Sequence, residues 1–262
     1  MVFAKFNNME VIFMEIKAVK LYQDGFMTQD FAFGGSADKN TLDQTKKYPS
    51  SLQNYVIDTG KEVILVDTGL PEETPDMQPS EGQKIYPGRK IEGYVAALNS
   101  AGYKPEQVSK ILLTHKHPDH SGELRSFSNA KIYLSKEEAD SLNLDGENII
   151  RAEFADGKYH NFDISQKISE GIYFIPAPGH TTGNSIVVVE KDGLFYMIHG
   201  DVTYTDAALI GNQLSVVFED KEAAKITLEK VREFIKNNPT VYVSTHTPEG
   251  IINLEEKKIM KL

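Results

Sequence analysis

Three histidines and an aspartate lie within six consecutive residues, in a chain of 262 residues that has only seven histidines. They are His115, His117, Asp119 and His120, in the segment THKHPDHSG. Imidazole nitrogen and carboxylate oxygen are both good zinc donors, whereas neutral imidazoles gain little from one another and charged ones repel. We therefore interpret the segment as part of a metal site rather than as an exposed histidine-rich loop.

The apolar run KILLT at residues 110–114, directly before the first of these histidines, predicts a strand that ends at His115. Because side chains alternate along a strand, His115 and His117 should lie on the same side, beyond the last paired residues. Asp119 and His120 should then turn into a short helix, which the run SGELRSF at 121–127 indicates. Four donors thus leave one strand end into one small volume.

Three further candidate ligands follow other predicted strands, each where the strand gives way to a turn. They are His180 in PAPGHTTGN, Asp201 in MIHGDVTY and His246 in VSTHTPEG. Taken alone, each is more often a turn or cap residue, but their shared placement is a strong signal. Together with the first four they make seven donors, which are too many for one four-coordinate zinc ion, so two ions are expected.

The elements that must position these residues are predicted to form a layered α/β structure. Helical periodicity appears at 90–103, with Ile91, Val95 and Leu98 on one face, and at 220–238, which stops at Pro239. Strand-like runs rich in Val, Ile and Tyr lie at 54–59, 62–69, 110–115, 131–135, 171–177, 185–190, 194–201 and 240–246. The amino-terminal residues 1–19 also alternate like a strand. Early strands come in pairs and later ones alternate with helices, which favours sheets inside and helices outside.

Composition narrows the class of protein. The net charge of −10 disfavours a nucleic-acid partner, and the absence of cysteine excludes thiolate zinc sites and cysteine nucleophiles. No run approaches the ~20 apolar residues of a membrane span, and residues 1–19 lack the pattern of a secretory signal, so we expect a cytoplasmic protein without a membrane partner.

No shift in composition marks a domain boundary, so residues 1–262 are expected to form one domain. The proline-rich segment Pro71–Arg89 is expected to be a long loop, such as a lid or binding loop.

The pattern His115-x-His117-x-Asp119-His120, with the downstream PGHTTGN, GD and TH, resembles the metallo-β-lactamase-fold hydrolase superfamily. The earlier VDTG, which begins at Val66, matches a structural turn of that superfamily. The resemblance runs from about residue 50 to about residue 250. It implies a four-layer αββα sandwich with a dinuclear zinc site, although iron, manganese or cobalt could replace zinc.

The resemblance also implies a division of the donors. The first ion would be held by His115, His117 and His180, the second by Asp119, His120 and His246, and Asp201 and a hydroxide would bridge the two. Such a pair acidifies water and polarises a carbonyl or phosphoryl group. Asp119 could also orient the water or accept its proton. Asp67 is expected to orient a histidine or, equally, to be a simple turn residue.

The type of hydrolase is indicated by Tyr204, three residues after Asp201, where N-acyl homoserine lactonases carry a tyrosine that hydrogen-bonds the lactone. A phenol there can donate to an oxygen that gains charge. The alternative is a packing tyrosine, since the chain has twelve. True β-lactamases do not use a bridging aspartate at the position of Asp201. The resemblance therefore favours a zinc-dependent hydrolase of a small-molecule lactone or carboxylic ester.

Other interpretations stay open. Two of the alternatives are enzymes: a thioesterase of the hydroxyacylglutathione hydrolase type and a phosphodiesterase. The third is a metal-bound scaffold or sensor without turnover. Pro118 stands where the lactonases commonly carry a larger side chain. The apolar run GFMTQDFAF at 25–33 could line an acyl pocket or belong to the core, and His160 and His199 lie outside the ligand pattern. The exact substrate, the physiological metal and the oligomeric state are left open.

Overall fold

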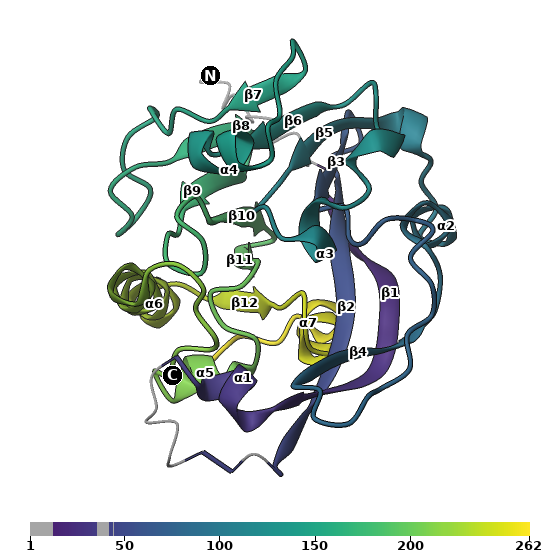
Figure 1. Ribbon diagram of the computed structural model, residues 1–262. Helices are drawn as coiled ribbons and strands as arrows, with labels where there is room; N and C mark the ends of the chain where they lie inside the picture. Colours follow the sequence, from purple (N-terminus) through teal and green to yellow (C-terminus); the bar gives the residue numbers. More distant parts are fainter. Residues whose placement is uncertain (1–12, 36–41, 44) are drawn as a thin grey trace, which may run out of the picture.

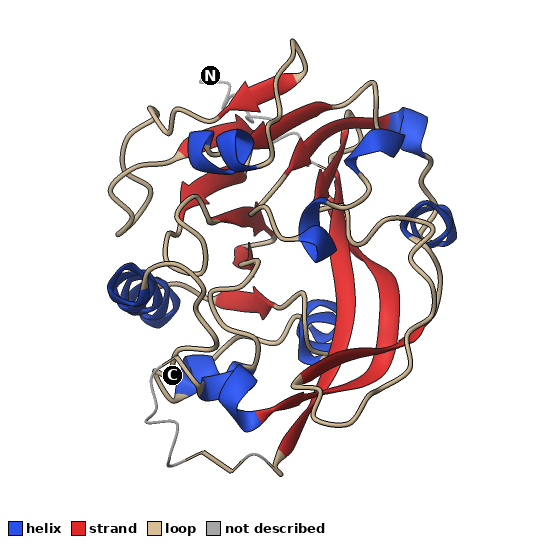
Figure 2. Ribbon diagram, in the orientation of Figure 1, coloured by secondary structure: helices blue, strands red, loops and turns tan. Residues whose placement is uncertain are grey.

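Two β-sheets lie face to face in the computed structural model, which describes residues 13–35, 42–43 and 45–262 (Figures 1 and 2). Within these residues the first sheet has seven strands in the order β4-β1-β2-β3-β5-β6-β7, and the second has five in the order β12-β11-β10-β9-β8. The strand expected over the amino-terminal residues falls partly outside the described residues, since β1 begins at Glu15.

The strands of the first sheet are β1 (Glu15–Thr28), β2 (Lys47–Asp58), β3 (Val63–Val66), β4 (Ile85–Lys90), β5 (Val108–Leu112), β6 (Lys131–Leu134) and β7 (Ile149–Arg151). Those of the second are β8 (Gln166–Ser169), β9 (Ile172–Pro176), β10 (Ser185–Lys191), β11 (Leu194–Ile198) and β12 (Thr240–Val243). The helices are α1 (Gln29–Phe33), α2 (Tyr94–Ser100), α3 (Pro118–Ser121), α4 (Lys136–Ser141), α5 (Asp206–Ile210), α6 (Lys221–Asn237) and α7 (Glu249–Glu256). Short 3₁₀ turns in the described residues include η2 (Pro105–Gln107) and η3 (Leu124–Ser126).

Side-chain alternation along the strands creates the layers. On β3, Ile64 faces the second sheet, while the next residue, Leu65, packs in the outer core with α2 and α4. On β10, Val187 faces the first sheet, while Val188 packs against α6. Each sheet thus buries both faces, one on its partner and one on helices. The architecture is the expected αββα sandwich (Figure 1).

The helix predicted at 220–238 is confirmed as α6. Asp220 caps it, because its carboxylate accepts from the backbone N–H groups of Glu222 and Ala223. The apolar stripe that includes Leu228, Val231 and Phe234 is buried against the second sheet. In the described part of the chain, no helix has both the length and the apolar content to cross a bilayer.

The prediction for 90–103 is wrong at both ends, because the helix α2 covers only Tyr94–Ser100. The helix α2 starts only after Gly93, and Ile91, which was placed on its apolar face, lies outside it and is 38% exposed. The buried residues of α2 are Tyr94, Ala97 and Leu98, so the prediction is confirmed for Leu98, whereas Val95 is only partly buried. The helical spacing of Ile91 is therefore fortuitous, since it belongs to the turn between β4 and the helix.

Two further predictions need correction. The segment Pro71–Arg89 is not a loop throughout, because its last residues form most of β4, which pairs with β1 at the edge of the first sheet. An edge strand tolerates Pro87, although proline argues against a strand in sequence-based reasoning. The short helix expected at 121–127 is replaced by α3, which contains Asp119 and His120, and by the separate turn η3.

Candidate metal centre

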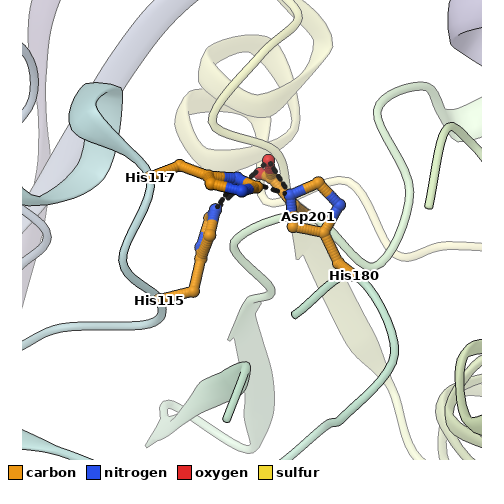
Figure 3. A group of neighbouring side chains, drawn as sticks. All are labelled: His115, His117, His180 and Asp201. Atoms are coloured by element: carbon orange, nitrogen blue, oxygen red, sulfur yellow. Dashed lines mark hydrogen bonds and ion pairs between the residues drawn. The ribbon is translucent and has the colours of Figure 1, made fainter. Parts of the chain in front are cut away.

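The seven donor side chains predicted from the sequence come together at the ends of four strands. Those of residues 115–120 follow β5, and the other three follow β9, β11 and β12. Donor atoms of His115, His117, His180 and Asp201, the first donor group, lie within 4.8 Å of one another, as do those of Asp119, His120 and His246, the second donor group. Figure 3 shows the first donor group, with its three rings turned toward the Asp201 carboxylate.

Nitrogen atoms face one another in the first donor group. Nε2 of His180 lies 2.9 Å from Nδ1 of His117, and Nε2 of His115 lies 3.1 Å from the same atom. Oδ2 of Asp201 lies 3.2 Å from Nε2 of His180. Three ring nitrogens and a carboxylate oxygen therefore point at one volume, which is the donor arrangement of a metal site.

The second donor group is arranged in the same way and touches the first through Asp201. Nε2 of His120 and Nε2 of His246 lie 3.2 Å apart, and Oδ2 of Asp119 lies 3.6 Å from the His246 nitrogen. Asp201 Oδ2 is 3.2 Å from His246 Nε2, and its Oδ1 is 3.4 Å from His120 Nε2. The Asp201 carboxylate is thus within reach of both donor groups.

The protonation of the first donor group suits a metal ion. Burial, with the neighbouring histidines, lowers the pKa of His115 well below its usual value and that of His180 to about 4. Burial also lowers the pKa of His117. These three rings are therefore neutral at physiological pH and keep the lone pairs that a metal requires.

The carboxylates give the centre a surplus of negative charge. Burial alone would raise the pKa of Asp201, but the surrounding imidazoles hold it well below its usual range. Burial alone would lower the pKa of His120, but Asp201 and Asp67 outweigh it and raise that pKa well above its usual value. A cation is thus favoured beside His120, and a divalent ion can take the place of its proton. The donor set fits a metal by both geometry and charge.

Asp67 determines which nitrogen His120 presents to the centre. Its Oδ2 lies 2.8 Å from His120 Nδ1, and because a carboxylate only accepts, Nδ1 carries a proton and Nε2 faces His246. The expectation that Asp67 orients a histidine matches this contact. Asp67 has a φ of 65°, in the left-handed region that costs energy for a residue with a Cβ. Its carboxylate holds that conformation by also accepting from the Thr114 backbone N–H at 2.7 Å.

The same aspartate acts on His115 through Thr114. The Thr114 hydroxyl donates to Asp67 Oδ2 at 2.9 Å, so its oxygen is left to accept from Nδ1 of His115 at 3.0 Å. His115 therefore presents Nε2. His180 is oriented similarly, with Nδ1 at 3.4 Å from the carbonyl oxygen of Val216. Three of the rings thus have the nitrogen away from the centre occupied, which leaves Nε2 for a metal.

Tyr204 lies beside the centre and is 3% exposed. Its ring centroid is 4.9 Å from that of His246 and 6.1 Å from that of His180. Burial, with the charges of Asp201 and Asp119, raises the pKa of the phenol well above its usual value. Tyr204 is therefore protonated and can act as a hydrogen-bond donor.

The apolar run 25–33 is divided between core and site. Met27 and Phe33 are buried in a cluster with Tyr204, as the packing interpretation expected. Phe31 is only partly buried and stacks on Tyr204, with ring centroids 5.2 Å apart. A second aromatic, Phe218, is 57% exposed and contacts two rings of the first donor group edge-on: its centroid lies 5.1 Å from that of His117 and 5.2 Å from that of His180.

Two histidines outside the ligand pattern stay outside both donor groups. His160 packs against Phe195 and Phe234, and His199 stacks on Tyr242 with centroids 3.8 Å apart. Among the described residues neither ring nitrogen of His199 has a hydrogen-bond partner. These placements agree with the expectation that neither residue is a ligand.

Sequence reasoning missed several residues that touch the centre or the loops around it. Phe218 gave no signal, because a single phenylalanine in a loop resembles any other. Glu138 and Glu219 bind the loops that carry the first donor group. A possible signal for Glu138 was the pattern Ser135-x-x-Glu138, but that pattern predicts a helix cap, and only the serine half of it forms.

Comparison with known proteins places the chain among metal-dependent hydrolases. The family model of the metallo-beta-lactamase superfamily matches residues 53–246. An N-acyl homoserine lactonase of Bacillus cereus is 26% identical over 219 residues, which cover 78% of this chain and 86% of the relative. A probable metallo-hydrolase of Methanocaldococcus jannaschii is 27% identical over 163 residues, or 62% of this chain and 67% of that protein.

Solved structures show the same fold. An N-acyl homoserine lactone hydrolase with the product N-hexanoyl-L-homoserine at its catalytic metal centre superposes with a TM-score of 0.68 and 21% identity, covering 95% of this chain and 96% of the other. The dizinc quorum-quenching lactonase AidC gives a TM-score of 0.59 with 18% identity, covering 90% and 91% of the two chains. At these identities the likeness concerns the fold.

Proposed function

We propose that this chain, a metal-dependent hydrolase that belongs to the metallo-β-lactamase superfamily, cleaves a small-molecule lactone or carboxylic ester with an apolar acyl group. N-acyl homoserine lactones are the first candidates, because relatives act on them. The single observation that carries the proposal is a buried phenol, Tyr204, whose ring contacts His246 and His180 beside the two donor groups.

In this proposal the first donor group would hold one divalent ion and the second donor group another, and the Asp201 carboxylate lies within reach of the residues of both groups. Zinc suits the histidine-rich donor set, and iron, manganese or cobalt are the other candidates. Bound there, two such ions supply the acidity that turns water into a nucleophile near neutral pH, and they polarise the ester carbonyl.

Asp119 is the donor best placed to handle protons. Its side chain is 33% exposed, whereas that of Asp201 is 2% exposed. A carboxylate that reaches both the centre and solvent can orient an attacking water, take its proton and release it. We assign this role to Asp119 in addition to its role as a ligand.

Tyr204 is assigned the role of donor to the substrate. Its raised pKa keeps the phenol protonated, so it donates to the carbonyl or leaving-group oxygen as negative charge develops there. Stacking on Phe31 and contact with His246 hold the ring in place. The ring that carries the hydroxyl is thus held beside the centre before the reaction begins.

The surroundings of the centre favour a neutral substrate with an apolar part. Phe218 offers apolar surface beside His117, and Phe31 offers it beside Tyr204. The nearby cation Lys116 is already paired with Glu219, and the chain carries a net charge of −10. A phosphodiester anion would therefore gain little from Lys116, whereas an uncharged acyl lactone gains apolar contact. Thioesters with an apolar acyl group remain the second candidates on the same ground.

A hydrolysis screen tests the proposal. Protein reconstituted with zinc is assayed on an acyl homoserine lactone, an acyl thioester and a phosphodiester of equal concentration. The lactone is expected to give the highest kcat/KM, and Asp201→Ala should abolish the activity while His160→Ala keeps it. Thioester hydrolysis without any lactone turnover would contradict the proposal and identify the protein as a thioesterase.

A further inference from the structure

Glu138 is a carboxylate with 1% exposure on α4, and it lies in neither donor group. Its Oε2 accepts from the backbone N–H of Lys116 at 2.7 Å. Its Oε1 accepts from the Thr181 hydroxyl at 2.7 Å and from the Gly183 backbone N–H at 3.0 Å. The three donors belong to the two loops that carry the histidines of the first donor group.

These contacts leave no room for variation at Gly183. A Cβ there would lie 2.1 Å from Ser135 Oγ and 2.7 Å from Glu138 Cγ, so the loop can approach α4 this closely only with glycine. The sequence GHTTGN is thus explained: His180 faces the centre, while Thr181 and Gly183 bind Glu138.

A second glutamate holds the same two loops from the outside. Glu219 pairs with the Lys116 ammonium group and accepts from the backbone N–H and the hydroxyl of Thr182. It is partly exposed, so its ion pair is screened by water and contributes about 1 kcal/mol at most. Glu138 makes its hydrogen bonds in a buried environment, where each one left unmade costs more.

We propose that Glu138 is a positioning residue that sets the affinity of the first donor group for its metal ion without touching that ion. Because His115 and His117 flank Lys116 and His180 precedes Thr181, the carboxylate determines how far apart the two loops lie. It makes no hydrogen bond to the residues of the second donor group. The effect should therefore be confined to the first ion.

The inference rests on the metal centre proposed above and gives a specific expectation for Glu138→Gln. The amide keeps the volume but turns N–H groups toward Lys116 or toward Gly183, where only an acceptor fits. Loss of a partner that orients metal ligands typically weakens metal affinity about 10–100-fold. We expect a loss of that size at the first donor group and none at the second.

The experiment measures the two donor groups separately. In a His246→Ala background the second group is incomplete, and metal-free protein is titrated with Co²⁺ against a chromophoric chelator to give the affinity of the first group. In a His180→Ala background the same titration reports the second group. Glu138→Gln is expected to weaken only the former, and Glu137→Gln, an exposed neighbour on the same helix, should change neither.

Two results would overturn the inference. One is equal affinity of the first group in Glu138→Gln and Glu137→Gln; the other is an equal loss at both groups, which would mark Glu138 as a general stabiliser of the fold. Should Glu138→Gln fail to fold, Thr181→Val removes one of the three donors at nearly constant volume and should weaken the first group alone by several-fold, whereas an unchanged affinity would contradict the proposal. Since no substrate is used, protein that binds both ions but hydrolyses no ester would refute the proposed substrate and leave this inference intact.

Discussion

Oδ2 of Asp67 lies 2.8 Å from Nδ1 of His120, and this contact connects a turn after β3 with the second donor group. Asp67→Asn keeps the shape but places an N–H group opposite the ring or opposite Thr114. We expect zinc affinity to fall about 10–100-fold, measured by chelator competition. Asp192→Asn is the matched control, because Asp192 also has positive φ but lies exposed in the β10–β11 turn. Equal zinc affinity in both variants would refute the orienting role.

Tyr204→Phe tests the phenol as a donor to substrate. The variant keeps the ring that stacks on Phe31 and removes only the hydroxyl, so metal content should not change. Removal of a well-placed donor to a developing oxyanion costs roughly 10²–10³ in turnover, and the loss should appear in kcat more than in KM. Steady-state kinetics on an acyl lactone provide the measurement, and an unchanged kcat would make Tyr204 a packing residue.

Phe218→Ala tests the apolar contact proposed for the acyl group. Loss of an exposed aromatic surface that binds an alkyl chain should lower kcat/KM about 5–30-fold for a long-chain lactone, at about 0.8 kcal/mol for each CH₂ that loses contact. A short-chain lactone should be affected less. Ile226→Ala, at an equally exposed site on α6, is the control. Equal losses for both chain lengths would place the acyl group elsewhere.

The contacts of Glu219 give a prediction for how the free energy of unfolding depends on pH. Its contacts with Lys116 and Thr182 overcome the effect of burial and lower its pKa from 4.5 to about 2. Between these values the unfolded chain binds more protons than the folded one, so the stabilisation is complete above about pH 4.5 and is lost as the pH falls toward 2. Glu219→Gln should therefore lower the free energy of unfolding by about 1 kcal/mol near neutral pH and by less at pH 3.5, as measured in urea. A pH-independent difference would contradict this ion pair.

The donor residues could be predicted because each follows an apolar run that ends in a turn, and such runs carry a clear periodic signal. His180 and His246 are far apart in sequence, but the convergence of strand ends brings them together. The errors have equally local causes. Ile91 has helical spacing yet precedes the glycine where α2 begins. Pro87 argued against a strand, although it lies in the edge strand β4.

The residues that position the donor side chains without being donors themselves could not be inferred in this way. Glu138 contacts loops about 20 and about 45 residues away in sequence, and its pattern with Ser135 is that of a helix cap. Thr114 is one more polar residue at a strand end until its hydroxyl is placed between Asp67 and His115. Such roles depend on distances that only the folded chain defines.

Ester hydrolysis by this protein is proposed to need two metal ions, one in each donor group. The most direct test of this requirement adds zinc in known equivalents to metal-free protein and measures the rate of lactone hydrolysis at each step. We expect no hydrolysis without metal and a rate that rises until about two equivalents per chain are bound, as the two donor groups require. A rate that reaches its plateau at one equivalent, or that does not depend on added metal, would contradict the requirement.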